Sequence, residues 1–243
     1  MQIVTIANQK GGSGKTATAA ALAQAAAHDG KKVLAIDLDP QGNLSFTLGA
    51  EMNRKTSLDL LEGEPARHII QHCGGLDVIP ASWNNQTIRS GAGSAKRLQK
   101  ALLPLKARYD LIVIDTPPTG GELQYNALQA STGLIIPLQA DIFGLQGLYQ
   151  IADTAEQIKA SNPALSVLGV VFTRHNPRST IARQMQEAIE NAAKEMGVPV
   201  LGAIREGVAI REAQALQTDL FDYAPKAKPA QDYMQLYETI REG

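Results

Sequence analysis

A glycine-rich stretch near the amino terminus contains the residue types that a polyphosphate needs. Residues 10–16 read KGGSGKT and lie between an apolar run, Ile3–Ala7, and an alanine-rich run, Ala17–Ala27. Glycines let backbone N–H groups approach phosphate oxygens, and the N-terminus of a helix favours negative charge. A lysine then reaches the β- and γ-phosphates and a hydroxyl binds Mg²⁺; Lys15 and Thr16 supply these groups here. The stretch predicts a site for a nucleoside triphosphate.

This stretch departs from the standard phosphate-loop pattern in the placement of its glycines. Gln9 occupies the position of the first glycine, and the glycines come later, with a lysine ahead of them. The order of strand, loop and helix is nevertheless the one that phosphate binding requires. We expect the nucleotide to contact the whole stretch, namely Lys10, Gly11, Gly12, Ser13, Gly14, Lys15, Thr16 and Ala17.

Two further apolar runs end in carboxylates. The run VLAID ends at Asp37 and is followed closely by Asp39, and the run LIVID ends at Asp115. In an open parallel sheet, ligands bind beyond the carboxyl ends of the strands. We therefore expect the three aspartates to converge on the phosphate loop and to position Mg²⁺ and water there.

Short apolar runs alternate with helical patterns along most of the chain. The runs are continuously apolar, as is typical of strands covered on both faces. We expect strands at Ile3–Ala7, Lys32–Asp37, Leu76–Pro80, Leu111–Asp115, Gly133–Leu138, Val167–Thr173 and Val198–Ile204. This alternation predicts an α/β fold: a doubly wound, mainly parallel sheet with helices on both faces. We expect residues 1–243 to form a single domain, with no room for an N-terminal helix-turn-helix module before the first strand.

The composition narrows the classes of function. The chain has 243 residues and a formal net charge of -1, without the bulk positive excess of a protein that coats nucleic acid as a monomer. Its one cysteine, Cys73, excludes a disulfide framework, a paired-cysteine redox site and a thiolate metal site within one subunit. The longest uninterrupted apolar run is Ala19–Ala23, far too short to cross a bilayer. We expect a cytoplasmic protein.

These motifs together resemble a known family. KGGSGKT with its additional lysine, DLDPQGN at residues 37–43 and IDTPP at residues 114–118 are similar to the deviant Walker A ATPases of the ParA/MinD superfamily. The run ANQKGGSGKT followed by DLDPQGN most resembles the short ParA/Soj partition ATPases. The likeness extends over nearly the whole chain. It implies a P-loop fold, Mg²⁺-dependent ATP hydrolysis with weak intrinsic turnover, and a homodimer that forms across ATP.

The resemblance also implies roles for the individual residues. Lys10 would be the signature lysine that reaches the phosphates of the partner subunit, and Lys15 would hold those of its own subunit. Thr16 would bind Mg²⁺ directly, while Asp37 and Asp115 would act mainly through bound water. Asp39 would orient the attacking water. We thus expect three catalytic residues, Lys10, Lys15 and Asp39, and three metal-site residues, Thr16, Asp37 and Asp115.

Two departures from the family pattern bear on ligands. The family usually has a second threonine after the Walker lysine, whereas Ala17 follows Thr16 here, which removes a hydroxyl. Two family arginines, one of them implicated in DNA binding, fall on Glu206 and Ala209. The DNA-contact residues of the family therefore do not transfer directly.

Local clusters of positive charge remain as candidates for DNA contacts. Residues 78–109 contain no acidic residue, and an acid-free group of arginines follows residue 173. Backbone contacts to DNA need only such point charges, and dimerisation doubles their number. We expect contacts from Arg97, Lys100, Arg174, Arg178, Arg205 and Arg211. Solvated surface cations would explain the first cluster equally well, and we expect Trp83 to lie in the core or an interface.

The function that these expectations favour is DNA partition. An ATP dimer would bind DNA non-specifically on the bacterial nucleoid and would be stimulated by a ParB-like protein. The cargo could be a plasmid, an integrative element or a chromosome. The alternative is a MinD-like membrane-cycling ATPase or one that positions protein clusters. Membrane cycling needs a terminal amphipathic helix with a basic rim, but residues 230–243 hold three acidic residues and one arginine. We expect no membrane partner.

Overall fold

The computed structural model of the protein describes residues 1–83, 94–176 and 180–242. Within these ranges the strands are β1 (Gln2–Ile6), β2 (Val33–Asp37), β3 (Gln71–Cys73), β4 (Leu76–Ile79), β5 (Leu111–Asp115), β6 (Gly133–Leu138), β7 (Ser166–His175) and β8 (Val200–Arg205). The α-helices are α1 (Lys15–His28), α2 (Asn43–Thr47), α3 (Ser57–Leu61), α4 (Arg97–Leu102), α5 (Glu122–Ala130), α6 (Ile142–Lys159), α7 (Thr180–Glu195), α8 (Val208–Ala215), α9 (Leu220–Tyr223) and α10 (Lys228–Glu242). Short 3₁₀ turns are η1 (Ala66–His68), η2 (Ser94–Lys96) and η3 (Leu103–Leu105).

The strands of the described residues form one sheet of eight, in the order β3-β4-β2-β5-β1-β6-β7-β8. Every neighbouring pair is parallel except β3–β4. The crossovers run in both directions from β1, so the predicted doubly wound, mainly parallel sheet is confirmed. β1 lies between β5 and β6, which places the loop after β1 at the middle of the sheet.

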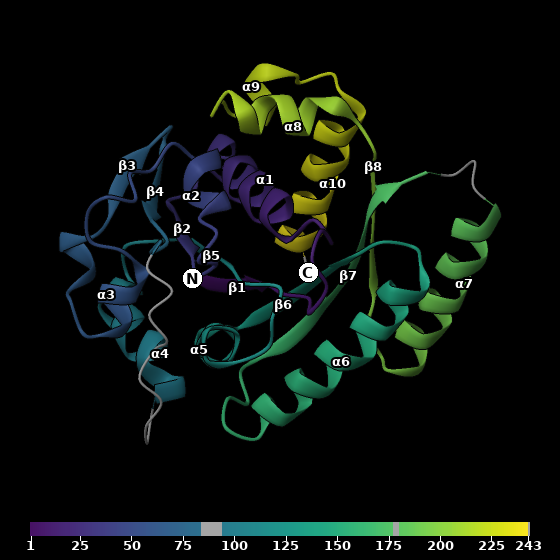
Figure 1. Ribbon diagram of the computed structural model, residues 1–243, viewed down its shortest axis with the longest axis horizontal. Coiled ribbons are helices and arrows are strands. Elements are labelled where there is room, and N and C mark those ends of the chain that lie inside the picture. Colours follow the sequence, from purple (N-terminus) through teal and green to yellow (C-terminus); the bar gives the residue numbers. More distant parts are fainter. Residues whose placement is uncertain (84–93, 177–179, 243) are drawn as a thin grey trace.

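Helices cover both faces of this sheet (Figure 1). α1, α8 and α10 lie on one face, and α4, α5, α6 and α7 lie on the other. Alternate residues of one strand serve the two faces: Ile3 packs with the α4–α5 side, whereas Val4 and Ile6 pack with α1. This is the period-two alternation of a strand buried on both sides, and it explains why the strand sequences read as continuous apolar runs.

The alanine-rich sequence of α1 lets this helix lie close to the sheet. Ala19, Ala23 and Ala26 have no exposed surface, and α1 packs against both β5 and α10. The C-terminal helix α10 uses its apolar face in the same layer, where Tyr233 and Leu236 are buried. No helix in the described ranges is long and apolar enough to span a membrane.

The observed strands include one that was not expected and differ from the expected ones at several ends. β7 continues to His175, two residues beyond the expected end, and β1, β2 and β4 differ from the expected bounds by one residue at one or both ends. β3 is not among the expected strands, because its three residues are too short and too polar to give an apolar run. It pairs with β4 through a hairpin at Gly74 and Gly75, which both have positive φ. β8 begins at Val200 rather than Val198, because the Val198 N–H donates to Ala193 and closes the end of α7.

Candidate nucleotide-binding site

The phosphate loop joins β1 to the first turn of α1. Gly12 and Gly14 adopt φ values of 73° and 90°, in the left-handed region that side chains disfavour. At Gly14 a Cβ would also lie 2.9 Å from Thr173 Cγ2. The loop conformation at residue 14 therefore requires glycine, and the chain enters α1 immediately afterwards.

A side chain of β7 and one just after β6 hold the loop by its carbonyl groups. Thr173 Oγ1 donates to the Ser13 carbonyl at 2.8 Å, and Gln139 Nε2 donates to the Gly12 carbonyl at 2.8 Å. Phosphate oxygens accept hydrogen bonds from the backbone N–H groups at the start of a helix, and these two contacts occupy carbonyl groups instead. The Ser13 hydroxyl is buried and has no hydrogen-bond partner among the described residues. The loop is thus held in place while a polar group on it remains available to a ligand.

Lys15 carries its ammonium group into the site. The residue is buried, and its Nζ donates to the Lys10 carbonyl at 3.1 Å. Burial lowers the pKa of Lys15, while the charges of Asp115 and Asp39 act in the opposite direction. A buried cation at a helix N-terminus is poised for an anionic ligand, and the triphosphate of a nucleotide fits this position.

Asp37 and Asp115 occupy paired positions on the neighbouring strands β2 and β5. Both are fully buried. Asp37 accepts hydrogen bonds from Ser45 N and Oγ at 2.8 and 2.7 Å, and Asp115 accepts one from Thr16 Oγ1 at 2.7 Å. The structure therefore brings Thr16 and the two carboxylates together at the carboxyl edge of the sheet.

Burial is the largest influence on the pKa values of these two carboxyl groups. It raises the pKa of Asp37 to about 6. Burial and the nearby charge of Asp37 also raise the pKa of Asp115 well above its ordinary value. Two desolvated carboxylates beside each other are stabilised in their ionised form by a divalent cation. Oxygen ligands of this kind, with the Thr16 hydroxyl, suit Mg²⁺.

Asp39 lies two residues beyond the end of β2 and is also buried. Its Oδ1 accepts a hydrogen bond from Gln41 N at 3.0 Å, and its carbonyl accepts one from Gly42 N at 2.8 Å. These bonds form a turn that holds the carboxylate near Lys15. Asp39 N also donates to Asp37 Oδ1 at 3.0 Å, so Asp39 lies beside the Asp37–Asp115 pair and outside it.

Lys10 is engaged by a residue that the sequence patterns did not single out. Its Nζ lies 2.6 Å from Asp141 Oδ2 and 5.4 Å from the centre of the Phe143 ring. The other oxygen, Asp141 Oδ1, accepts from Gly144 N at 2.7 Å and caps α6. An aspartate between an apolar run and a helical pattern is a capping signal, which could have located Asp141 but not its contact with Lys10.

Comparison with known proteins agrees with this geometry. The family described as AAA domain, AAA_31, matches residues 1–167. The chain is 34% identical to the chromosome-partitioning ATPase Soj of Thermus thermophilus, over 98% of this chain and 94% of that protein. It is 36% identical to the chromosome partitioning protein ParA of Caulobacter vibrioides, over 99% and 94%. This chain belongs to the ParA/Soj type of ParA/MinD-family ATPases.

Solved structures place this ParA/Soj-type chain among P-loop ATPases with bound nucleotide. The septum site-determining protein MinD of Pyrococcus horikoshii, complexed with Mg-ADP, is 26% identical with a TM-score of 0.81, over 98% of this chain and 94% of that one. Cobyrinic acid a,c-diamide synthase of Mycobacterium smegmatis, with an ATP analogue and magnesium, is 29% identical with a TM-score of 0.83, over 98% and 93%.

The candidate DNA contacts do not form one surface in this ParA/Soj-type chain. Arg97 and Lys100 lie on α4, whereas Arg174 and Arg205 lie on β7 and β8 at the other side of the sheet, and Arg211 lies on α8, which packs against α2 and α10 (Figure 1). Arg205 forms a bidentate ion pair with Asp232, with an NH2–Oδ1 distance of 2.6 Å.

Two of the remaining candidates are exposed at the edge of the sheet that carries the nucleotide site. Arg174 lies near the carboxyl end of β7, and Arg211 lies on α8, which follows β8. Arg178 lies outside the described residues. The expectation that Trp83 could be a core residue is wrong, because 63% of its surface is exposed.

Proposed function

We propose that this chain is a DNA-partition ATPase that uses ATP and Mg²⁺. The observation that carries the proposal is the phosphate loop with its additional lysine, beside three buried strand-end aspartates. Its relatives named chromosome-partitioning ATPase Soj and chromosome partitioning protein ParA support the same function. Residues 1–243 would act as one ATPase domain, because the residues of the site lie on α1 or on loops and strand ends of one sheet.

The proposed chemistry divides among the residues by their positions. Bound Mg²⁺ would neutralise charge on the phosphates during transfer to water. Lys15 and the loop N–H groups hold the triphosphate, and Thr16, Asp37 and Asp115 hold the metal. Asp39 orients the attacking water. Positioning and charge neutralisation account for most of the catalysis in phosphoryl transfer, so Asp39 does not have to be a strong base.

Lys10 would complete the nucleotide site of a second subunit. Each subunit of the homodimer would then add a positive charge to the partner's nucleotide, and hydrolysis would remove the charge that joins them. This dimer would bind DNA non-specifically on the nucleoid, in the bacterial cytoplasm, and a ParB-like protein would stimulate its turnover. The membrane alternative has less support, because the apolar face of α10 packs against α1.

The ion pair between Lys10 and Asp141 competes with this cross-subunit role. An Asp141→Asn protein keeps an oxygen to cap α6 but loses the charge that holds Lys10. We expect its ATP-dependent dimer to be about two- to fivefold more stable, as suits a partly exposed ion pair. Sedimentation equilibrium with ATP and Mg²⁺ measures this. A dimer affinity equal to or below that of the parent protein would contradict the proposed competition.

Binding to a random-sequence DNA duplex tests the partition proposal. We expect binding with ATP and Mg²⁺ but little without nucleotide, and a steep loss of affinity with salt. An Arg211→Ala protein should bind DNA several-fold more weakly with a shallower salt dependence, because a phosphate contact is removed. Lys159→Ala is the matched control, because Lys159 is exposed at the end of α6, away from the nucleotide edge. Equal DNA binding in the nucleotide-free and ATP states would reject the switch, and recruitment to anionic liposomes would favour the membrane alternative.

A further inference from the structure

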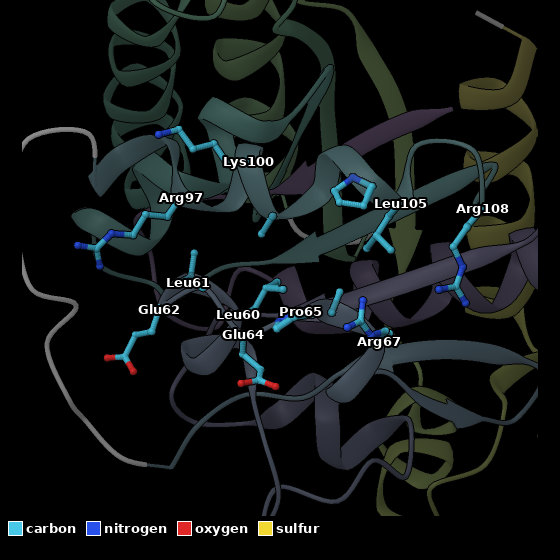
Figure 2. Close-up of a pocket in the computed structure, with 14 residues that line it drawn as sticks. Leu60, Leu61, Glu62, Glu64, Pro65, Arg67, Arg97, Lys100, Leu105 and Arg108 are labelled. Carbon is cyan, nitrogen blue, oxygen red and sulfur yellow. The ribbon is translucent and has the colours of Figure 1, made fainter.

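A large cavity lies apart from the nucleotide site. It has a volume of about 1190 Å³ and is lined by residues within 60–67 and 97–108, from α3, η1, α4 and η3 (Figure 2). We call it the α3–α4 groove. Its lining, as far as the chain is described, includes no residue of the phosphate loop and none of the three aspartates. A ligand in this groove would therefore leave the nucleotide site accessible.

The groove carries more positive than negative charge. Four cations line it: Arg67, Arg97, Lys100 and Arg108. The structure records no ion pair between a carboxylate and Arg67, Lys100 or Arg108 within its described ranges, although the Arg67 Nε–H donates to His68 at 3.2 Å. Arginine and lysine side chains that have no carboxylate partner attract the carboxylate or phosphate groups of a ligand.

The two acidic residues of the lining differ in their surroundings. Glu64 accepts hydrogen bonds from Lys55 Nζ and His68 Nδ1, which lower its pKa and offset its charge. Glu62 is exposed and forms no ion pair in the described structure. Both lie along one wall of the groove, on the α3 side (Figure 2). A ligand with evenly spaced negative charges, such as a nucleic-acid backbone, would be repelled by these carboxylates.

The cations are divided between the two ends of the groove. Arg97 and Lys100 lie toward one end in Figure 2, and Arg67 and Arg108 lie toward the other. An extended chain that follows the groove would pass both pairs. The wall between them includes Pro65, whose apolar ring suits peptide side chains. The sequence of a peptide can place its carboxylates beside the cations and leave neutral side chains beside Glu62. A nucleic-acid backbone carries a phosphate at every nucleotide, so one of its phosphates would lie near the Glu62 carboxylate.

We propose that the α3–α4 groove docks an extended acidic segment of a protein partner. Carboxylates of that segment would pair with the cations at the two ends, and its apolar side chains would contact the wall between them. The inference does not depend on the partition function, because no residue of the nucleotide site takes part. A partner bound here could therefore remain in place through the ATPase cycle.

The test uses the full-length protein and three labelled probes: a peptide of glutamate interspersed with alanine and proline, the same peptide with lysine in place of glutamate, and a random-sequence DNA duplex. We expect the protein to bind the glutamate peptide and not the lysine peptide in fluorescence anisotropy. An Arg67→Glu/Arg108→Glu protein should bind the glutamate peptide at least about tenfold more weakly. Lys106→Glu is the matched control, because this exposed cation on the same segment does not line the groove.

Two further measurements make the result independent of folding of the double variant. A Glu62→Lys protein should bind the glutamate peptide several-fold more tightly, since it adds a cation to the wall. Hydrogen exchange should slow in residues 57–68 and 97–108 when the glutamate peptide binds. The proposal is overturned if the glutamate peptide does not bind, if its protection falls elsewhere, or if Lys106→Glu causes an equal loss. A preference for the duplex, lost on Arg67→Glu/Arg108→Glu, would instead assign the groove to DNA.

Discussion

An Asp39→Ala protein is expected to bind ATP normally and to lose at least about 100-fold of its ATP turnover. The Asp39 carboxylate is buried beside Lys15 and outside the Asp37–Asp115 pair, so its removal leaves the proposed metal site intact. The turn loses the hydrogen bond that the Asp39 carboxylate accepts from Gln41 N, a cost of about 1 kcal/mol in stability. Phosphate release and thermal unfolding measure the two effects separately.

The same variant should accumulate as the ATP dimer, because hydrolysis is the step that separates the subunits. Binding to a random-sequence duplex should then persist with ATP, and its salt dependence should become steeper. Asp153→Ala is the control, because Asp153 is an exposed carboxylate on α6 whose side chain contacts Gln157. Turnover at the parental rate would show that Asp39 only forms the turn. An inactive protein that also fails to bind ATP would assign Asp39 to nucleotide binding.

Much of the fold and of the nucleotide site was predictable because both depend on local sequence. A parallel strand covered on both faces needs a continuous apolar run, and a ligand edge needs polar residues where such a run stops. Asp37 and Asp115 satisfy both conditions, and they occupy paired positions in the sheet. The phosphate loop is likewise contiguous, so its glycines, its lysine and its hydroxyl could be found together.

Features that depend on distant contacts were not predictable. Lys10 and Asp141 are 131 positions apart, and the β1–β6 pairing brings their segments together. The α3–α4 groove joins two short helices whose sequences show no common pattern. The ion pair of Arg205 with Asp232 likewise could not be read from charge counts. A cation that is already paired within the protein is less available to DNA, so Arg205 is a weaker candidate for a DNA contact than the charge counts indicate.

A Lys10→Ala protein is expected to bind ATP as a monomer but to lose at least about tenfold of its ATP-dependent dimer affinity. The Lys10 side chain lies on the nucleotide edge, where it is partly exposed and held by Asp141 within its own subunit. ATP in a second subunit would have to draw this lysine away from Asp141. Nucleotide titration and sedimentation equilibrium measure binding and dimerisation separately.

The alternative is that Lys10 serves only its own subunit. Loss of a partly exposed ion pair would then cost about 0–1 kcal/mol in stability and leave dimerisation unchanged. Lys10→Arg separates the two explanations, because it keeps the charge near Asp141 but presents a wider, planar group to the partner's phosphates. A Lys10→Ala protein that dimerises normally with ATP would refute the cross-subunit role. Loss of dimerisation in Lys10→Ala together with the gain expected for Asp141→Asn would show that the intramolecular ion pair and the dimer compete for one ammonium group.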